Sequence, residues 1–391
     1  MKNFEMYMPT RVLFGSGQLN NLHKQVMPGK KALILISSGK SARVNGSLKR
    51  VEDELKLANI PYVIFDEIEA NPLKESVMKG AMYARKENVD FIIALGGGSV
   101  LDASKALATM ATNCGDLWDY ISGGTGKGKK IAINPLPLIA ITTTAGTGSE
   151  VDQWGVISDL KTNEKIGFGG DDRLFPVLAI VDPQLMLSVP KEFSAYQGFD
   201  TLFHSLEVYI GKYSNLATDM ITTKAIEKIV KYLPEVIKDG TNLKAREEVA
   251  FANTLSGLAM VFGSTTSEHS LEHALSAYHH NLPHGAGLIM ISKSYFKHFI
   301  DKGVIPERFI ELARIFGNKN ANKPSDFIIE LTKLQEACGV SNLMMSEYGI
   351  KESKFQEMAI NAKVTMGSLF LADPLELSLS DCINIYKESY K

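Results

Sequence analysis

The stretch that decides the fold is VDFIIALGGGSVLDASKALATMAT, residues 89–112. It opens on Val89–Leu95, where the apolar run Phe91–Leu95 predicts a strand buried on both faces, as in a parallel sheet. Gly96–Ser99 follow at once, and a helix is expected from there to about Thr112. Glycines allow a ligand to approach the backbone, and a helix start offers unpaired N–H groups to a phosphate. The pattern favours a phosphate-binding turn, with a tight strand–helix turn as the alternative.

Strand-like and helix-like segments alternate with this unit through the first half of the chain. We expect strands at Ala32–Ser37, Tyr62–Phe65, Leu136–Ile141 and Val177–Val181, helices at Val44–Leu57 and Asn71–Lys86, and an opening extended pair at Phe4–Met8 and Arg11–Phe14. Such alternation predicts a parallel sheet with helices on both faces. The Gly- and Lys-rich segment Asn113–Pro135 is expected to be a surface loop.

The pattern changes near Val189, beyond which helical periodicity is found with almost no strand signal. Helices are expected at Lys191–Ile210, Leu216–Lys238, Leu243–Val261, Glu268–Ala277, Gly287–Ile300, Pro306–Phe316, Ser325–Cys338, Lys354–Ala362 and Leu379–Tyr390. We therefore predict two domains, an α/β domain over residues 1–188 and an all-helical domain over residues 189–391.

Composition and charge narrow the class of protein. The net charge of −2 over 391 residues suggests neither a nucleic-acid partner nor an anionic membrane surface. The longest apolar runs fall well short of the ~20 residues of a membrane span, and the first residues lack the apolar core of a secretory signal. Three widely spaced cysteines without a CxxC pair fit a reduced compartment. We expect a cytoplasmic protein.

Histidines are concentrated in one stretch, Ser267–Gly287 (SEHSLEHALSAYHHNLPHGAG), which holds five of the eight. His269 and His273 are four residues apart, the spacing that places two side chains on one face of a helix. Asp200 and His204 repeat this spacing upstream. A buried aspartate needs a partner or a metal ion to offset its desolvation.

One carboxylate and three imidazoles form a plausible ligand set for iron, zinc or another divalent first-row ion. His284, in the turn Leu-Pro-His-Gly, is the third imidazole beside His204 and His269. There are more candidates than a four-ligand site needs, so we assign His273 to proton transfer beside the metal. His279 and His280 are expected to lie outside the site.

Two further turns are candidates for nucleotide contacts. The small-residue loop Thr142–Glu150 follows a predicted strand, and its hydroxyls and glycines could line the same nucleotide as Gly96–Ser99. For Asp102 we give equal weight to two interpretations: a contact to the nucleotide, or a partner of the helix dipole in the first turn. The turn Ser37-Ser38-Gly39-Lys40 has two hydroxyls and a lysine where a carboxylate would repel a 2′-phosphate. This favours NADP(H), with a simple polar turn as the alternative.

Five motifs, taken in order and spacing, are specific together. They are GGGSVLDASKA (96–106), TTAGTGSE (143–150), KIGFG (165–169), GFDTLFHSLEVYI (198–210) and HSLEHALSAY…LPHGAGL (269–288). With them, the sequence resembles the iron-containing (group III) alcohol dehydrogenase family over nearly its full length. The resemblance implies a Rossmann-like parallel-sheet domain followed by an all-α domain, the dehydroquinate synthase-like superfamily fold.

The resemblance also assigns roles to residues. It implies that Asp200, His204, His269 and His284 bind the metal ion and that His273 lies near the substrate and the nicotinamide. The residues implied to contact the cofactor are Gly97, Gly98, Ser99, Thr143, Thr144, Thr147 and Lys165, and the turn residues Ser37, Ser38 and Lys40 look like those of NADP-type members.

The implied reaction is the interconversion of primary alcohols and aldehydes, as in butanol dehydrogenase. The implied cofactors are Fe²⁺, with Zn²⁺ or another divalent ion as alternatives, and NADP(H) in preference to NAD(H). A small-diol oxidoreductase acting on 1,3-propanediol or on lactaldehyde/1,2-propanediol is the close alternative. A dehydroquinate synthase-like lyase is less favoured, because no cluster of Arg or Lys lies near His269–His284. A homodimer or larger homo-oligomer is expected by analogy.

Two features depart from the family pattern. The interval from His273 to His284 is one residue longer than in comparable members, with the extra residue within Tyr278–Leu282. Trp154 is a bulky aromatic where many diol-active members have a smaller polar residue near the cofactor. The longer interval implies either a differently shaped ligand turn or entry of His280 into the pocket. Trp154 bears on the substrate more than on the reaction.

Overall fold

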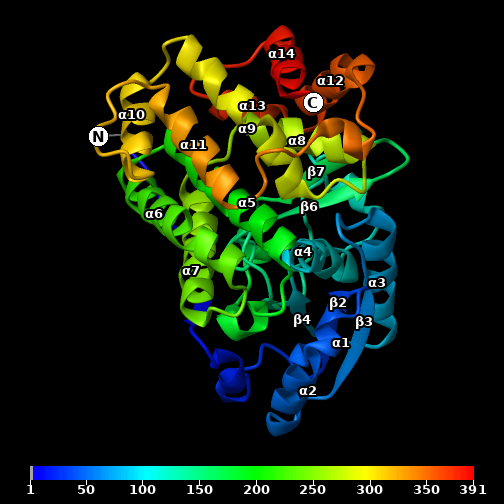
Figure 1. Cartoon of the computed structure of the whole chain (residues 1–391). Helices are drawn as coiled ribbons and strands as arrows, with labels where there is room; N and C mark the ends of the chain where they lie inside the picture. The colour runs from blue at the N-terminus through cyan, green and yellow to red at the C-terminus, as the bar shows by residue number, and fades with distance from the viewer. Residues whose placement is uncertain (1–2) are drawn as a thin grey trace. The chain divides into compact units, whose positions relative to one another are not determined.

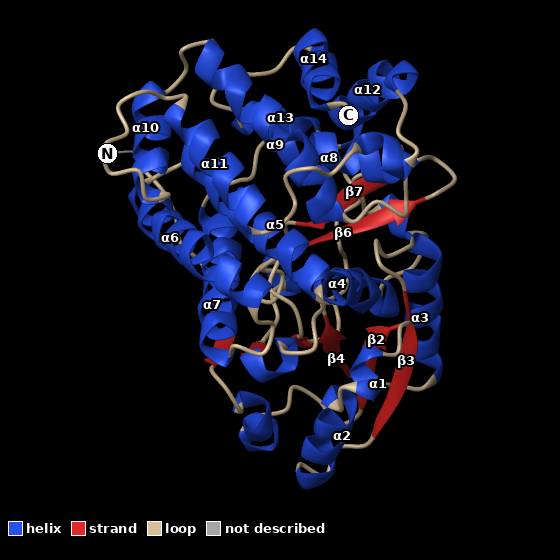
Figure 2. Ribbon diagram, in the orientation of Figure 1, coloured by secondary structure: helices blue, strands red, loops and turns tan. Residues whose placement is uncertain are grey.

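The structure, a computed structural model, describes residues 3–391. It contains two compact units. One unit spans Tyr7–Val189, and the other comprises Pro190–Lys391 together with residues 3–6. Figures 1 and 2 show the chain by position and by secondary structure.

The first unit is built on a six-stranded, all-parallel sheet. Its strands are β1 (Arg11–Phe14), β2 (Ala32–Ser37), β3 (Tyr62–Ile68), β4 (Phe91–Gly96), β5 (Leu138–Thr142) and β8 (Leu178–Val181), in the order β1-β8-β5-β4-β2-β3. The five strands predicted between Ala32 and Val181 are all present, and the predicted parallel sheet is confirmed. The carboxyl ends of β2, β4 and β5 therefore meet at one edge of the sheet.

Helices cover both faces of this sheet, because its central strands are apolar on both sides. They are α1 (Ser41–Val44), α2 (Ser47–Leu57), α3 (Lys74–Lys86) and α4 (Gly98–Thr112), with short 3-10 turns between elements. Leu33 and Leu35 of β2 belong to the core shared with α3 and α4, whereas Ile34 and Ile36 belong to the core shared with α2. Successive strand residues point to opposite faces, so one strand serves both cores. Figure 2 shows α3 beside β3.

A second sheet was not predicted. Strands β6 (Trp154–Asp159) and β7 (Glu164–Gly169) form an antiparallel hairpin. The hairpin packs closely on α4, since a Cβ atom on Gly155 would lie 2.9 Å from Cα of Asp102. Its position depends on this tertiary contact more than on strand-forming residues.

Several predicted boundaries were wrong. The helix expected over Val44–Leu57 begins only at Ser47, because Gly46 adopts φ +78°, and Val44 instead ends the short helix α1. Residues 4–8 form no strand, and β1 pairs with β8 instead. Within Asn113–Pro135 the chain is partly buried: the Trp118 indole N–H donates a 2.7 Å hydrogen bond to Glu164 of β7.

The second unit is helical throughout, as predicted. Its helices are α5 (Lys191–Ile210), α6 (Leu216–Lys238), α7 (Leu243–Phe262), α8 (Ser267–Tyr278), α9 (His284–Asp301), α10 (Pro306–Ile315), α11 (Asp326–Ala337), α12 (Phe355–Thr365), α13 (Gly367–Ala372) and α14 (Leu379–Ser389). Helix α5 is buried on all sides from Ser194 except at Gln197, and it contacts α6, α7 and α9 (Figure 1). A helix apolar all round belongs in a core, so polar residues on α5 require partners there.

Among residues 3–391, no helix is both long enough and apolar enough to cross a membrane.

Candidate metal centre and cofactor loops

Helix α5 carries the first two predicted ligands, Asp200 and His204. They lie one turn apart on the same face, with 4% and 6% of their surfaces exposed. His204 Nδ1 is 3.6 Å from Asp200 Oδ1. An ionised carboxylate at this depth is costly unless positive charge or hydrogen-bond donors surround it.

Helices α8 and α9 bring the other candidates to Asp200. His269 lies in the first turn of α8, and His284 is the first residue of α9. Asp200 Oδ1 is 3.4 Å from His269 Nε2 and 3.5 Å from His284 Nε2. The ring of His204 stacks on that of His269, with 4.3 Å between centroids. The structure thus gathers the three predicted histidine ligands around the carboxylate of the fourth, Asp200.

The spacing of these atoms fits a divalent ion. Asp200, His269 and His284 each offer one ligand atom, and these atoms all lie within 4.8 Å of one another. A tetrahedral ion with bonds of about 2.1 Å holds its ligand atoms about 3.4 Å apart. The donor set of carboxylate oxygen and imidazole nitrogen suits iron or zinc equally.

Two buried glutamates hold the imidazoles, and the sequence analysis missed both. Glu207 contacts Nδ1 of His269, and Glu272 contacts Nδ1 of His284. Both glutamates are fully buried. A carboxylate on Nδ1 fixes the imidazole tautomer and directs the lone pair of Nε2 toward the metal position. The available signal was helical spacing, because Glu207 follows Asp200 by seven residues and Glu272 follows His269 by three.

The electrostatics of this cluster require positive charge. Burial alone would raise the pKa of Asp200, but His204, His284 and His269 together hold it well below its ordinary value. Burial would lower the pKa of His269, yet Glu207 and Asp200 raise it to about 10. The buried carboxylates therefore favour a cation at this position, which protonated imidazole or a divalent metal ion can supply.

His273 stands beside the group, one helical turn after His269. Its ring centroid is 5.2 Å from that of His284 and 6.3 Å from that of His269. Its Nδ1 lies 2.8 Å from the sulfur of Met366. His273 also forms a second three-residue group of ligand atoms with Glu272 and His284. His279 and His280 lie in the connection between α8 and α9 and belong to neither group.

The predicted phosphate loops lie against each other in the first unit. Gly97–Ser99 join β4 to α4, and the loop with Thr143, Thr144 and Thr147 follows the neighbouring strand β5. A Cβ atom on Gly97 would lie 2.8 Å from Oγ1 of Thr144, and one on Gly98 would lie 2.3 Å from Cγ2 of Thr147. The glycines are thus required for the close approach of the two loops.

A buried network fixes the second loop. Asp102 accepts hydrogen bonds from the Ser149 hydroxyl at 2.7 Å and the Val156 amide at 2.9 Å, and burial raises its pKa to about 6. Fully buried Lys105 contacts Ser149 and pairs with Asp152 at 2.6 Å. Asp102 therefore has a role that neither sequence interpretation included: it joins α4 to the loop and to β6.

The remaining predicted cofactor residues occupy two places. Ser37 ends β2, and Ser38 and Lys40 form the exposed turn before α1, at the edge of the sheet where β4 also ends. Lys165 lies on β7, in the hairpin, and its side chain is buried.

Comparison with known proteins places the chain in a family. The family model described as "Iron-containing alcohol dehydrogenase" matches residues 9–183, and "Fe-containing alcohol dehydrogenase family, C-terminal" matches residues 194–390. The chain is 30% identical to "Probable NADH-dependent butanol dehydrogenase 1" of Bacillus subtilis, over 100% of both chains. It is 31% identical to "1,3-propanediol dehydrogenase" of Citrobacter freundii, over 99% of both.

A solved structure agrees with these matches. The crystal structure of an archaeal halo-thermophilic alcohol dehydrogenase from a Red Sea brine pool superposes with a TM-score of 0.93 and 32% identity, over 100% of both chains. These three relatives are all named as dehydrogenases, so none of them supports the less favoured lyase activity. The protein belongs to the iron-containing alcohol dehydrogenase family and is a metal-dependent, nicotinamide-linked alcohol dehydrogenase that interconverts primary alcohols and aldehydes.

Proposed function

We propose that the protein reduces short unbranched aldehydes such as butanal, using Fe²⁺ held by Asp200, His204, His269 and His284. The observation that carries this proposal is the meeting of His269 Nε2 and His284 Nε2 at Asp200 Oδ1, at 3.4 and 3.5 Å. When bound, the ion would polarise the substrate oxygen and the nicotinamide would supply the hydride. We assign the two units to these tasks: residues 1–188 as the dinucleotide-binding domain and residues 189–391 as the metal-binding catalytic domain.

The residues of the chain would prepare the site and move the proton. Glu207 and Glu272 hold His269 and His284 through Nδ1, so that Nε2 of each ring faces Asp200. His273, whose Nδ1 is directed at Met366, would exchange the proton through Nε2. In aldehyde reduction this proton goes to the substrate oxygen as hydride reaches the carbon, and it is taken back in alcohol oxidation.

The substrate proposal is tested with purified enzyme by following reduced-nicotinamide absorbance. We expect turnover of butanal after Fe²⁺ loading, with Zn²⁺ as the comparison ion. A relative named 1,3-propanediol dehydrogenase makes a small-diol substrate the second candidate. A higher kcat/KM for 3-hydroxypropanal than for butanal would favour that candidate. No turnover across a panel of aldehydes and alcohols would refute both.

We further propose that the nicotinamide cofactor is NADP(H), bound through the pyrophosphate at Gly97, Gly98 and Ser99. The support is the turn Ser37–Lys40 at the end of β2, which offers hydroxyls and an ammonium group and no carboxylate. The cofactor would also contact Thr143, Thr144, Thr147 and Lys165.

The cofactor proposal differs from the names of some relatives, which describe NADH-dependent butanol dehydrogenases. The test is the ratio of kcat/KM for NADPH and NADH, in the wild type and in Lys40→Asp. We expect NADPH to be preferred and the substitution to reverse the preference. An unchanged ratio in Lys40→Asp would show that the turn does not discriminate between cofactors with and without the 2′-phosphate.

We also propose a cytoplasmic location and a homo-oligomeric state for the protein. All three cysteines are free, two of them buried, which is consistent with a reducing cytoplasm. A homodimer or larger homo-oligomer is proposed by analogy with the family. Light scattering on the eluted peak of a sizing column would measure the mass, and a monomer would contradict the proposal.

A further inference from the structure

A cavity of mixed polar and apolar lining in the helical unit lies outside the candidate metal centre. It is bounded by α9, by α11 and the segment that follows it, and by the end of α14 with Lys391, and its volume is about 110 Å³. None of its lining residues is a predicted metal ligand or cofactor contact. The groups that matter are the ammonium groups of Lys293 and Lys391, the amide of Gln335 and the hydroxyl of Ser389.

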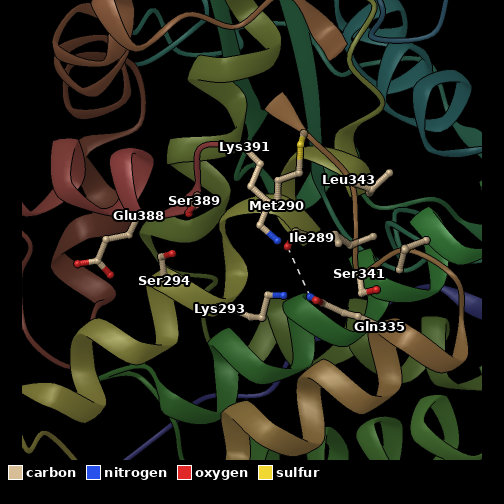
Figure 3. Close-up of a pocket in the computed structure, with 11 residues that line it drawn as sticks. Ile289, Met290, Lys293, Ser294, Gln335, Ser341, Leu343, Glu388, Ser389 and Lys391 are labelled. Atoms are coloured by element: carbon tan, nitrogen blue, oxygen red, sulfur yellow. Dashed lines mark hydrogen bonds between the residues drawn. The ribbon is translucent and has the colours of Figure 1, made fainter. Parts of the chain in front are cut away.

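Two lysines bring positive charge to this cavity, whose lining also includes Glu388. Figure 3 shows the side chains of Lys293 and Lys391 directed into it, while the carboxylate of Glu388 points away. Within residues 3–391, neither ammonium group makes a hydrogen bond or an ion pair. Burial, and then the charge of Lys391, lower the pKa of Lys293, and Glu336 offsets this only in part. Two cations at one cavity favour an anion between them.

The backbone of Lys391 is fixed in place. Its carbonyl oxygen accepts hydrogen bonds from the Ser346 amide at 3.2 Å and from the Ser346 hydroxyl at 2.8 Å. The side chain therefore starts from an anchored position beside α9.

Gln335 adds a buried acceptor that has no donor. The residue is fully buried, and its Oε1 makes no hydrogen bond among the described residues. The orientation of the amide is set by its neighbours: the Ser292 hydroxyl donates to Ile289 O, so it accepts from Gln335 Nε2 at 3.1 Å. The nitrogen must face Ser292, which leaves Oε1 for another partner. Ser389 Oγ, in a residue 7% exposed, is likewise without a partner.

These groups together specify a ligand chemistry. A ligand that fits must accept hydrogen bonds from two ammonium groups and donate one to Gln335 Oε1. Water takes about 30 Å³ in the liquid, so the cavity has room for one small oxyanion. We propose that this cavity is a binding site for a small, protonated tetrahedral oxyanion of the hydrogen phosphate class, distinct from the cofactor loops.

The charge and protonation of the ligand can be separated experimentally. Sulfate has the same shape as phosphate and comparable charge but carries no proton at neutral pH, so it cannot donate to Gln335 Oε1. An orphaned buried acceptor costs about 1–3 kcal/mol, which corresponds to ~5- to 150-fold in affinity. We therefore expect phosphate to bind at least ~5-fold more tightly than sulfate.

The test is calorimetric titration of inorganic phosphate into the metal-loaded enzyme at constant ionic strength and pH 7. Saturating NADPH is present, so that the cofactor loops are already occupied. We expect saturable binding of one phosphate per chain. Lys293→Met should weaken it ~10-fold or more, the loss of a charge-assisted hydrogen bond. Lys297→Met is the matched control, because Lys297 lies one turn further along α9 and pairs with Asp301 at the surface; its affinity should equal that of the wild type.

Lys391→Met is the second variant, chosen because Lys391 is exposed and its change should leave the fold intact. Circular dichroism and the unfolding temperature establish that each variant is folded. The proposal is overturned by the absence of saturable phosphate binding, which would show that the cavity holds only water. It is also overturned by equal phosphate affinity in the wild type and in both Lys293→Met and Lys391→Met. Neither result bears on the alcohol dehydrogenase activity, which is assayed separately.

Discussion

Oδ1 of Asp200 on α5 lies 3.4 Å from Nε2 of His269 on α8, and the opposite nitrogen of the same ring contacts Glu207. The imidazole is thus held between two buried carboxylates. One carboxylate fixes the proton on Nδ1, and the other marks the position of the metal ion. Residues that touch no substrate should therefore govern metal affinity.

The first prediction concerns Glu207→Gln. The amide can no longer fix the tautomer and charge of His269, so metal affinity should fall ~10–100-fold. Chelator competition with metal analysis measures this without an activity assay. Glu227→Gln is the matched control, since Glu227 pairs with Lys224 at the surface of α6. Equal affinity in wild type and Glu207→Gln would contradict the role of Glu207.

The second prediction separates proton transfer from metal binding. His273→Ala should retain the metal ion, and its kcat should fall by ~10²-fold or more, the usual contribution of a general acid–base group. The limb of the pH–rate profile due to His273 should disappear. The control is His298→Ala, a half-buried histidine on α9 outside both ligand groups. An unchanged pH–rate profile in His273→Ala would rule out its proton role, and loss of the metal would instead make it a ligand.

The third prediction tests the close approach of the cofactor loops. A methyl group at residue 98 would lie 2.3 Å from Cγ2 of Thr147, so Gly98→Ala must displace one loop. Overpacking of this kind costs about 1–3 kcal/mol, and we expect NADPH affinity to fall ~10-fold or more as the loops separate. Gly367→Ala is the control, because nothing lies within 4 Å of its added Cβ atom. Fluorescence titration measures the dissociation constant of NADPH for both variants and the wild type. Equal dissociation constants for Gly98→Ala and the wild type would contradict the packing argument.

The fourth prediction concerns the stability of the wild type relative to Asp102→Asn as pH changes. Burial raises the pKa of Asp102 from 3.8 to about 6. Between these values the folded chain binds more protons at this residue than the unfolded chain does. The contribution of Asp102 to the free energy of unfolding is therefore present at low pH and is lost as pH rises through 6. At ~1.4 kcal/mol per pKa unit, the free energy of unfolding falls by up to about 3 kcal/mol over this pH range.

Urea unfolding of both proteins from pH 4 to 7.5 measures this difference. Asp53→Asn, an exposed substitution on α2, is the control and should show no such decline. A wild-type advantage that rises with pH would contradict the buried, protonated state of Asp102.

The sequence predicted the sheet because its signals are local. A run such as Phe91–Leu95 cannot be solvated on either face, so it must lie inside a parallel sheet. The hairpin of β6 and β7 was missed because Gly155 and Lys165 are weak strand formers, and α4 supplies the surface that holds them. Spacing along the chain likewise could not show that Gly98 and Thr147, from separate loops, would come into contact.

The candidate ligands were predictable because helical spacing places Asp200 with His204 and His269 with His273. Glu207 and Glu272 were missed because a lone glutamate on a helix is most often a solvated residue. Only the burial of both side chains, with an imidazole nitrogen against each, distinguishes them. The cavity at Lys293 also required the structure, because Gln335 and Lys391 are far from it in sequence.

The most direct test of the metal site is the metal content of His269→Ala and His284→Ala after Fe²⁺ loading, measured by elemental analysis on folded protein beside the wild type. We predict one ion per chain in the wild type, and loss of both the ion and butanal reduction in each variant. A variant that still holds one ion per chain and reduces butanal at the wild-type rate would contradict the assignment.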